Sequence, residues 1–260
     1  MKRFVKLCIS LLLRAVDATC ETFCRFIGRP LAPRCIVIYY HTIPSELKPL
    51  FIRQLDVITR LAQPIATTPP ALLQLGKRYV CVTFDDGFLS VKENAAPELT
   101  RRNIPWTIFV PSGQLGKKPE WLRQAHPAAR HDRVMTPEEL RDLAQDPLVT
   151  VGSHTMAHAN LLEVGMERAT QELKQSKTDL EAVLGKPVEQ FSYPFGARNA
   201  ALDAQAKDAG YSRIFSSSPA PAFRSADEFV SGRITVDPDI SPLEFRLKIL
   251  GAYRWLAKGR

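Results

Sequence analysis

Short, strongly apolar segments alternate along most of the chain with segments of helical periodicity. The apolar segments that we interpret as strands are 35–40, 79–84, 104–110, 148–152, 190–193, 211–216 and 229–236. Helical patterns lie near 50–62, 89–102, 136–145, 166–184, 198–209 and 242–257. Apolar strands separated by helices are typical of a parallel sheet with covered faces. About seven such units predict an α/β fold, a single-domain distorted (β/α) barrel of about seven parallel strands.

Polar side chains follow several of the predicted strands. His41 follows the first strand, Asp85 and Asp86 follow the second, His154 follows the fourth, and Tyr193 ends the fifth. In β/α barrels the reactive groups lie at the carboxyl ends of the strands. We therefore expect these side chains to gather in one site.

The first 34 residues differ from the rest, so we divide the chain into a basic amphipathic helix with its linker, 1–34, and a barrel domain, 35–260. A stripe of polar residues recurs at helical spacing: Lys6, Ser10, Arg14, Asp17, Glu21 and Arg25. Such a helix either packs on its own domain or lies in a membrane interface. An export signal is the third alternative, although the apolar run 7–13 is short and no small-residue cleavage site follows.

Composition is ordinary for a globular enzyme, but charge is unevenly distributed. Residues 1–34 carry a net charge of +5 and residues 233–260 a net charge of +3, whereas 35–232 are neutral. A neutral middle argues against a nucleic-acid partner, and basic ends favour an anionic membrane surface. Five cysteines without paired spacing fit a reducing compartment. We expect a cytoplasmic protein, peripheral on the inner face of the membrane; these patterns leave export open.

Two motifs carry metal chemistry. Asp85 and Asp86 precede Gly87, and His154 and His158 lie four residues apart, so that both imidazoles can reach one ion. Taken alone, the first motif could be an exposed turn and the second an incidental pair. Together, two histidines and one carboxylate predict a site for one divalent ion, Zn²⁺ above all, with Co²⁺, Ni²⁺ or Mn²⁺ as alternatives. The second carboxylate would then be free to accept a proton.

The chain resembles a known family at these motifs. Thr83-Phe84-Asp85-Asp86-Gly87 and Ser153-His154-Thr155-Met156-Ala157-His158 look like the first two motifs of the polysaccharide deacetylases, carbohydrate esterase family four with its NodB-type domain. The resemblance extends from about 35 to 236 and includes Thr107-Ile108-Phe109-Val110-Pro111, Glu172-Leu173 and Phe191-Ser192-Tyr193-Pro194-Phe195-Gly196. It implies a distorted β/α barrel, a zinc-like ion, and hydrolysis of N-acetyl groups on sugars, less often O-acetyl or N-formyl groups.

The resemblance also assigns roles. It makes Asp85 the general base and Asp86, His154 and His158 the metal ligands. The third motif spans Tyr193, Pro194, Phe195 and Gly196, and the backbone N–H after its proline would face the oxyanion. Plain packing is the alternative for Tyr193 and Phe195.

Two departures from the family pattern stand out. Ser192 occupies the place where the third motif usually has an arginine; Arg233 could replace that arginine beside Asp85, or be a surface charge. In addition, no histidine follows His158, although the family's last motif supplies a late histidine as general acid.

Three other histidines remain. His41 lies in Ile38-Tyr39-Tyr40-His41-Thr42-Ile43, which resembles the opening of an exopolysaccharide- and lipopolysaccharide-associated branch. We expect it to be an active-site residue and candidate general acid, with a capped core histidine as the alternative. His126 and His131 lie in a loop rich in Pro and Arg and are expected at the surface.

The sequence thus predicts a metal-dependent hydrolase that removes an N-acyl group, above all acetyl, from an amino sugar of a polysaccharide or lipid-linked saccharide. A glycan-binding pseudoenzyme that keeps the metal site, and a deacylase of a non-sugar amide, are the alternatives.

Overall fold

The computed structural model describes residues 2–68, 73–121 and 130–257. Its helices are α1 (Lys2–Phe26), α2 (Lys48–Leu61), α3 (Ala96–Arg101), α4 (Pro137–Leu143), α5 (Met166–Leu184), α6 (Ala200–Asp208) and α7 (Pro242–Ile249). Its strands are β1 (Arg34–Tyr40), β2 (Gln63–Pro64), β3 (Arg78–Phe84), β4 (Trp106–Val110), β5 (Val149–Ser153), β6 (Gln190–Ser192), β7 (Arg213–Phe215), β8 (Val230–Ser231) and β9 (Ile234–Thr235).

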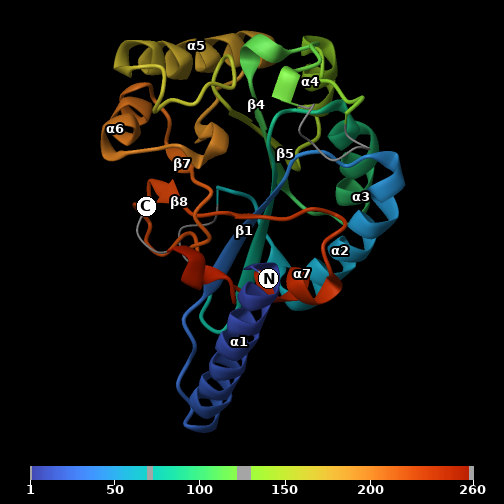
Figure 1. Ribbon diagram of the computed structural model, residues 1–260, viewed down its shortest axis with the longest axis vertical. Coiled ribbons are helices and arrows are strands. Elements are labelled where there is room, and N and C mark those ends of the chain that lie inside the picture. Colours follow the sequence, from blue (N-terminus) through green and yellow to red (C-terminus); the bar gives the residue numbers. More distant parts are fainter. Residues whose placement is uncertain (1, 69–72, 122–129, 258–260) are drawn as a thin grey trace.

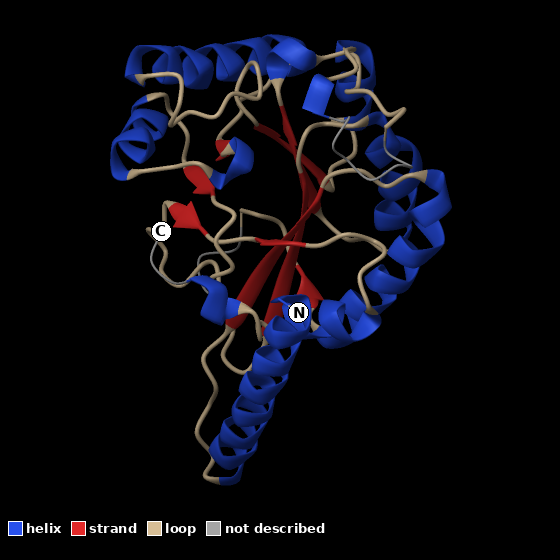
Figure 2. Ribbon diagram, in the orientation of Figure 1, coloured by secondary structure: helices blue, strands red, loops and turns tan. Residues whose placement is uncertain are grey.

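These strands form one curved parallel sheet in the order β8-β7-β6-β5-β4-β3-β1-β9, with β2 added beside β3. Helices α2 to α6 lie outside the sheet (Figures 1 and 2). The predicted fold is confirmed as a single-domain parallel half-barrel. Its strands are buried along most of their length, as their unbroken apolar sequences require.

The prediction of a single strand at 229–236 is wrong. The segment forms two short strands, β8 beside β7 and β9 beside β1, at the two edges of the sheet. Gly232 lies between them, and a Cβ there would come within 2.5 Å of the Ser218 carbonyl oxygen. One segment therefore spans the gap between the two edges, and its middle residues belong to neither strand.

Two predicted helices are shorter or more irregular than expected. The pattern near 242–257 ends at Ile249, because Gly251 adopts a left-handed conformation (φ 73°) that closes the turn against Arg34 and Ile36. The pattern near 89–102 begins as a π-helical turn, Val91–Ala95, before α3. Pro97 lacks the N–H that a continuous α-helix would use at that point.

The short strand β2 is missing from the sequence prediction altogether. Its two residues include a proline, and neither the length nor the composition of Gln63–Pro64 is strand-like. By contrast, Thr136 caps α4 as its sequence suggests: the Thr136 hydroxyl accepts the Glu139 N–H at 3.2 Å, and the Glu139 carboxylate accepts the Thr136 N–H at 2.8 Å.

The amino-terminal segment forms the long helix α1, which runs beside α7 and then projects beyond the rest of the molecule (Figure 1). No helix within the described ranges combines the length and apolar character needed to cross a bilayer.

Candidate metal and catalytic site

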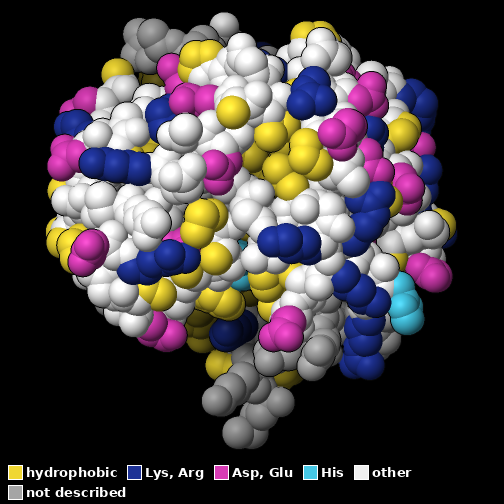
Figure 3. Space-filling view, turned by 90° about the horizontal axis from the view of Figure 1, so that it is seen from above, with side chains coloured by type: hydrophobic (Ala, Val, Ile, Leu, Met, Phe, Trp, Pro, Cys, Tyr) yellow, Lys and Arg dark blue, Asp and Glu magenta, His cyan; other side chains and the backbone are white. Residues whose placement is uncertain are grey.

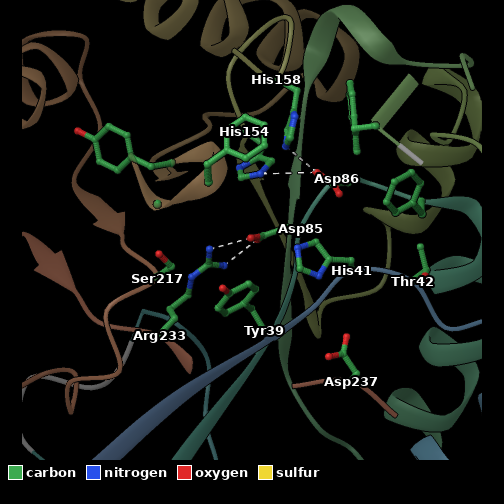
Figure 4. A pocket seen from close by; sticks show the side chains of 15 residues that line it. Tyr39, His41, Thr42, Asp85, Asp86, His154, His158, Ser217, Arg233 and Asp237 are labelled. Atoms are coloured by element: carbon green, nitrogen blue, oxygen red, sulfur yellow. Dashed lines mark hydrogen bonds and ion pairs between the residues drawn. The ribbon is translucent and has the colours of Figure 1, made fainter. Parts of the chain in front are cut away.

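The polar residues that follow the strands line one cavity of about 390 Å³ (Figure 4). The sheet hydrogen bonds continue one residue past two of the strands: the Asp85 N–H donates to the Tyr40 carbonyl at 2.9 Å, and the His154 N–H donates to the Val110 carbonyl at 3.0 Å. These hydrogen bonds hold the backbone at Asp85 and His154. They therefore fix the points from which these two side chains extend into the cavity.

Asp86, His154 and His158 converge in this cavity. Their candidate ligand atoms lie within 4.8 Å of one another. The Asp86 Oδ1 atom is 3.1 Å from His158 Nε2 and 3.6 Å from His154 Nε2. Asp86 and His158 have φ angles of 71° and 60°, conformations that cost energy outside glycine and that turn both side chains toward the shared centre.

The donor set fits a divalent ion. Asp86 Oδ1 is buried and accepts no hydrogen bond from any described residue. His154 Nδ1 lies 2.8 Å from the Ser192 carbonyl, so its proton belongs on Nδ1 and the Nε2 lone pair faces Asp86. Burial lowers the pKa of His154 to about 4, which keeps the ring neutral, as a ligand must be. Two imidazoles and one carboxylate are the ligands of a catalytic zinc site, which keeps further positions open.

The turn that carries His158 is held from behind by Glu172 on α5. The buried Glu172 carboxylate accepts hydrogen bonds from the N–H groups of Met156 and Ala157 at 2.9 and 2.8 Å. It accepts a further hydrogen bond from the Arg168 guanidinium at 2.8 Å. The motif around Glu172 that resembles the family therefore has a structural reason. It fixes the backbone between the two histidines.

Aromatic rings pack against the His158 ring. Trp121 stacks on it with ring centres 4.1 Å apart, and Phe195 meets it edge-on at 4.9 Å. Sequence reasoning missed Trp121, because a lone tryptophan in an irregular loop gives no signal of position.

Arg233 lies against Asp85. Its guanidinium donates to both carboxylate oxygens, Nη1 to Oδ1 at 2.7 Å and Nη2 to Oδ2 at 2.8 Å, which is the bidentate geometry of a strong ion pair. Burial raises the pKa of Asp85, but Arg233 and His154 more than offset it and hold the pKa below its ordinary value. Asp85 is thus a charged, oriented carboxylate that points away from Asp86 and toward Arg233 (Figure 4).

Ser192 and Arg233 fit together. The Ser192 hydroxyl accepts a hydrogen bond from Arg233, and the guanidinium lies over the ring of Tyr39, 4.4 Å from its centre. Arg233 is fully buried, so the alternative of a surface charge is excluded. Arg233, in the segment that joins β8 to β9, therefore supplies the positive charge that the third motif lacks.

His41 lines the same cavity, half-buried, with its ring centre 5.5 Å from that of Tyr39. His131 is exposed, and His126 lies outside the described residues. Sequence reasoning missed Asp237, which also lines the cavity. It follows the predicted strand 229–236, so the rule of polar residues at strand ends could have found it.

The third motif forms a tight turn, Pro194–Gly196, at the end of β6. Tyr193 and Phe195 line the cavity, as does Gly196, where a Cβ would collide with the Ser217 side chain. The Tyr193 hydroxyl donates to Asp203 at 3.0 Å, so this group is engaged in the cavity wall, and Pro194, the first residue of the turn, is buried.

Comparisons with known proteins give a consistent result. The model of the polysaccharide deacetylase family matches residues 73–214. A Bacillus subtilis (strain 168) protein, YxkH, named provisionally as a polysaccharide deacetylase, is 25% identical over 177 residues, 68% of this chain. The chain spans 56% of the length of that relative.

Solved structures are also similar to the chain. IcaB from Ammonifex degensii superposes with a TM-score of 0.71 at 25% identity, covering 86% of this chain and 98% of its own. The Streptococcus pyogenes deacetylase PplD, solved in complex with acetate, has a TM-score of 0.61 at 20% identity and covers 82% and 95%.

Proposed function

The chain belongs to the polysaccharide deacetylase family, and on this premise we propose that it is a metal-dependent N-deacetylase of an amino sugar in a polysaccharide or lipid-linked saccharide. The observation that carries the proposal is the pair of adjacent carboxylates with separate surroundings. Asp85 is held by Arg233, and Asp86 faces His154 and His158.

The proposed reaction adds water to the acyl carbon and breaks its bond to nitrogen, giving a carboxylate and a free amine. Asp85 accepts a proton from the water, and His41 donates a proton to the departing nitrogen. The N–H of Phe195, after the motif's proline, faces the developing oxyanion. A divalent ion held by Asp86, His154 and His158 would polarise the acyl oxygen and make the water more acidic.

The surroundings of Asp85 favour an enzyme over a glycan-binding pseudoenzyme. Arg233 supplies the positive charge that Ser192 cannot, and it orients both oxygens of Asp85. His41 brings a histidine to the cavity from the first strand, although none follows His158 in the chain. Both departures from the family motifs are thus matched by another residue in the same cavity.

The purified protein is expected to release acetate from an N-acetylglucosamine tetramer, to lose this activity with a chelator, and to regain it with zinc or cobalt. An O-acetylated sugar and an N-acetylated amino acid, assayed in parallel by mass spectrometry, test the substrate class. His154→Ala should bind less metal and be inactive. Turnover of the amino acid alone would indicate a non-sugar deacylase, and full metal content in His154→Ala would contradict the ligand assignment.

His41→Ala is expected to retain its metal and to lower kcat by roughly 10²-fold, because the departing nitrogen loses its proton donor. Steady-state kinetics and metal analysis measure both quantities. His131→Ala is the matched control, since its side chain is exposed and outside the cavity. An unchanged kcat in His41→Ala would leave protonation to another group.

A further inference from the structure

Helix α1 contacts the domain through its polar side chains. The Asp17 carboxylate accepts hydrogen bonds from Arg254 at 2.7 and 2.8 Å and from Arg34 at 3.1 Å. Glu21 pairs with Arg78, and Ser10, fully buried, accepts the Trp255 indole N–H at 3.1 Å. The middle of the polar stripe that the sequence shows on this helix, from Ser10 to Glu21, therefore faces the protein, which is the reverse of an ordinary surface helix.

Most of the large apolar side chains of α1 consequently face away from the protein, although Leu7 packs against the core. Phe4, Leu12, Phe23 and Phe26 are 69%, 67%, 61% and 87% exposed. Four more large apolar residues of this segment are also exposed: Val5, Leu11, Val16 and Ile27. The other exposed large apolar residues of the described chain are spread over several elements: Leu75, Leu162, Met166, Phe195 and Leu243. A concentration of this kind on one element marks an interaction surface.

The margins of this apolar face are positively charged. Lys6 and Arg25 are exposed on α1, and Arg29 follows it; none of the three has an ion pair with a described residue. The two acidic residues of the helix, Asp17 and Glu21, are enclosed in ion pairs with arginines. At the opposite end of the molecule, acidic and basic side chains are interspersed (Figure 3). The exposed surface of α1 thus combines apolar and cationic groups without acidic ones.

We propose that α1 binds an anionic phospholipid bilayer, lying along its surface with the apolar face inserted among the headgroups and with Lys6 and Arg25 against lipid phosphates. The helix is not apolar enough to cross the bilayer, whereas an interfacial position uses both its exposed apolar side chains and its cations. A second copy of the chain is a poorer partner. Packing two of these faces together would bring their cationic margins against each other. This inference does not depend on the deacetylase activity.

Vesicle flotation of the full chain tests the proposal. The protein is expected to float with vesicles of phosphatidylcholine containing about a third phosphatidylglycerol, more at low salt than at high salt, because exposed charges are screened. Vesicles of phosphatidylcholine alone should bind it several-fold less. The combined variant Leu12→Ser, Phe23→Ser and Phe26→Ser should reduce flotation by at least 10-fold.

The matched control carries the same number of apolar-to-serine changes elsewhere: Leu75→Ser, Leu162→Ser and Leu243→Ser. It should float like the wild type. Because the α1 variant leaves the polar contacts of the helix intact, its circular dichroism and melting temperature should be unchanged. Equal flotation of both triple variants would overturn the proposal. So would a dimer in sedimentation that dissociates in the α1 variant while the wild type binds no vesicles, since that result would identify a second copy as the partner.

Discussion

Asp85→Asn is expected to lower kcat by roughly 10²- to 10⁴-fold, the contribution of a placed general base. Asparagine keeps the shape of the side chain but cannot accept the proton of the attacking water. Because Asp86, His154 and His158 remain, the metal content of the variant should equal that of the wild type. Steady-state acetate release and elemental analysis on the same preparation measure the two effects.

The neighbouring variant Asp86→Asn provides the comparison. It should also be inactive, but through weakened metal binding, because Asp86 belongs to the ligand set and Asp85 does not. The two substitutions are chemically identical and one residue apart. If Asp85→Asn lost the metal, or turned over at the wild-type rate, the assignment of the base would be wrong.

Arg233→Met is expected to lower the free energy of unfolding by about 3–5 kcal/mol, the usual cost of leaving a buried charge without its partner. Asp85 and Arg233 are both buried, and the guanidinium makes the two charged hydrogen bonds to the carboxylate. Chemical denaturation measures the loss. The variant should also have a lower kcat, because Asp85 is no longer oriented by Arg233 and no longer has beside it the positive charge that keeps its pKa low.

The double variant Asp85→Asn/Arg233→Met separates an unpaired charge from lost packing. With both charges removed it should regain much of the stability that Arg233→Met loses, yet remain inactive. Arg233→Lys should fall between, because an ammonium keeps the charge but not the bidentate contact. If the double variant were as unstable as Arg233→Met, the loss of stability would come from the lost packing of the arginine side chain and not from the unpaired charge.

The sequence by itself determines the frame of this protein. Apolar strands that alternate with helices require a parallel sheet whose outer face is covered by those helices. In a parallel sheet all strands finish at the same end, so Asp85, Asp86 and His154 come together there. Four-residue spacing lets His158 join them. These inferences succeed because they depend on local periodicity and on the chemistry of adjacent residues.

Only the tertiary structure decides which distant residues complete the site. Arg233 is 148 positions from Asp85 along the chain, and its position depends on how 230–235 spans the two sheet edges. Trp121 reaches His158 from a loop whose path has no sequence signal. Long-range packing of this kind is set by the whole fold and leaves no periodicity to read.

The same limit applies to α1. The sequence shows a helix with a polar stripe and an apolar remainder, but the direction in which each face points depends on the partners available. Arg34, Arg78 and Arg254 lie where they can neutralise Asp17 and Glu21. Half-buried carboxylates such as these are stabilised by such partners, so the domain holds the polar face, and most of the apolar face of α1 is left outside.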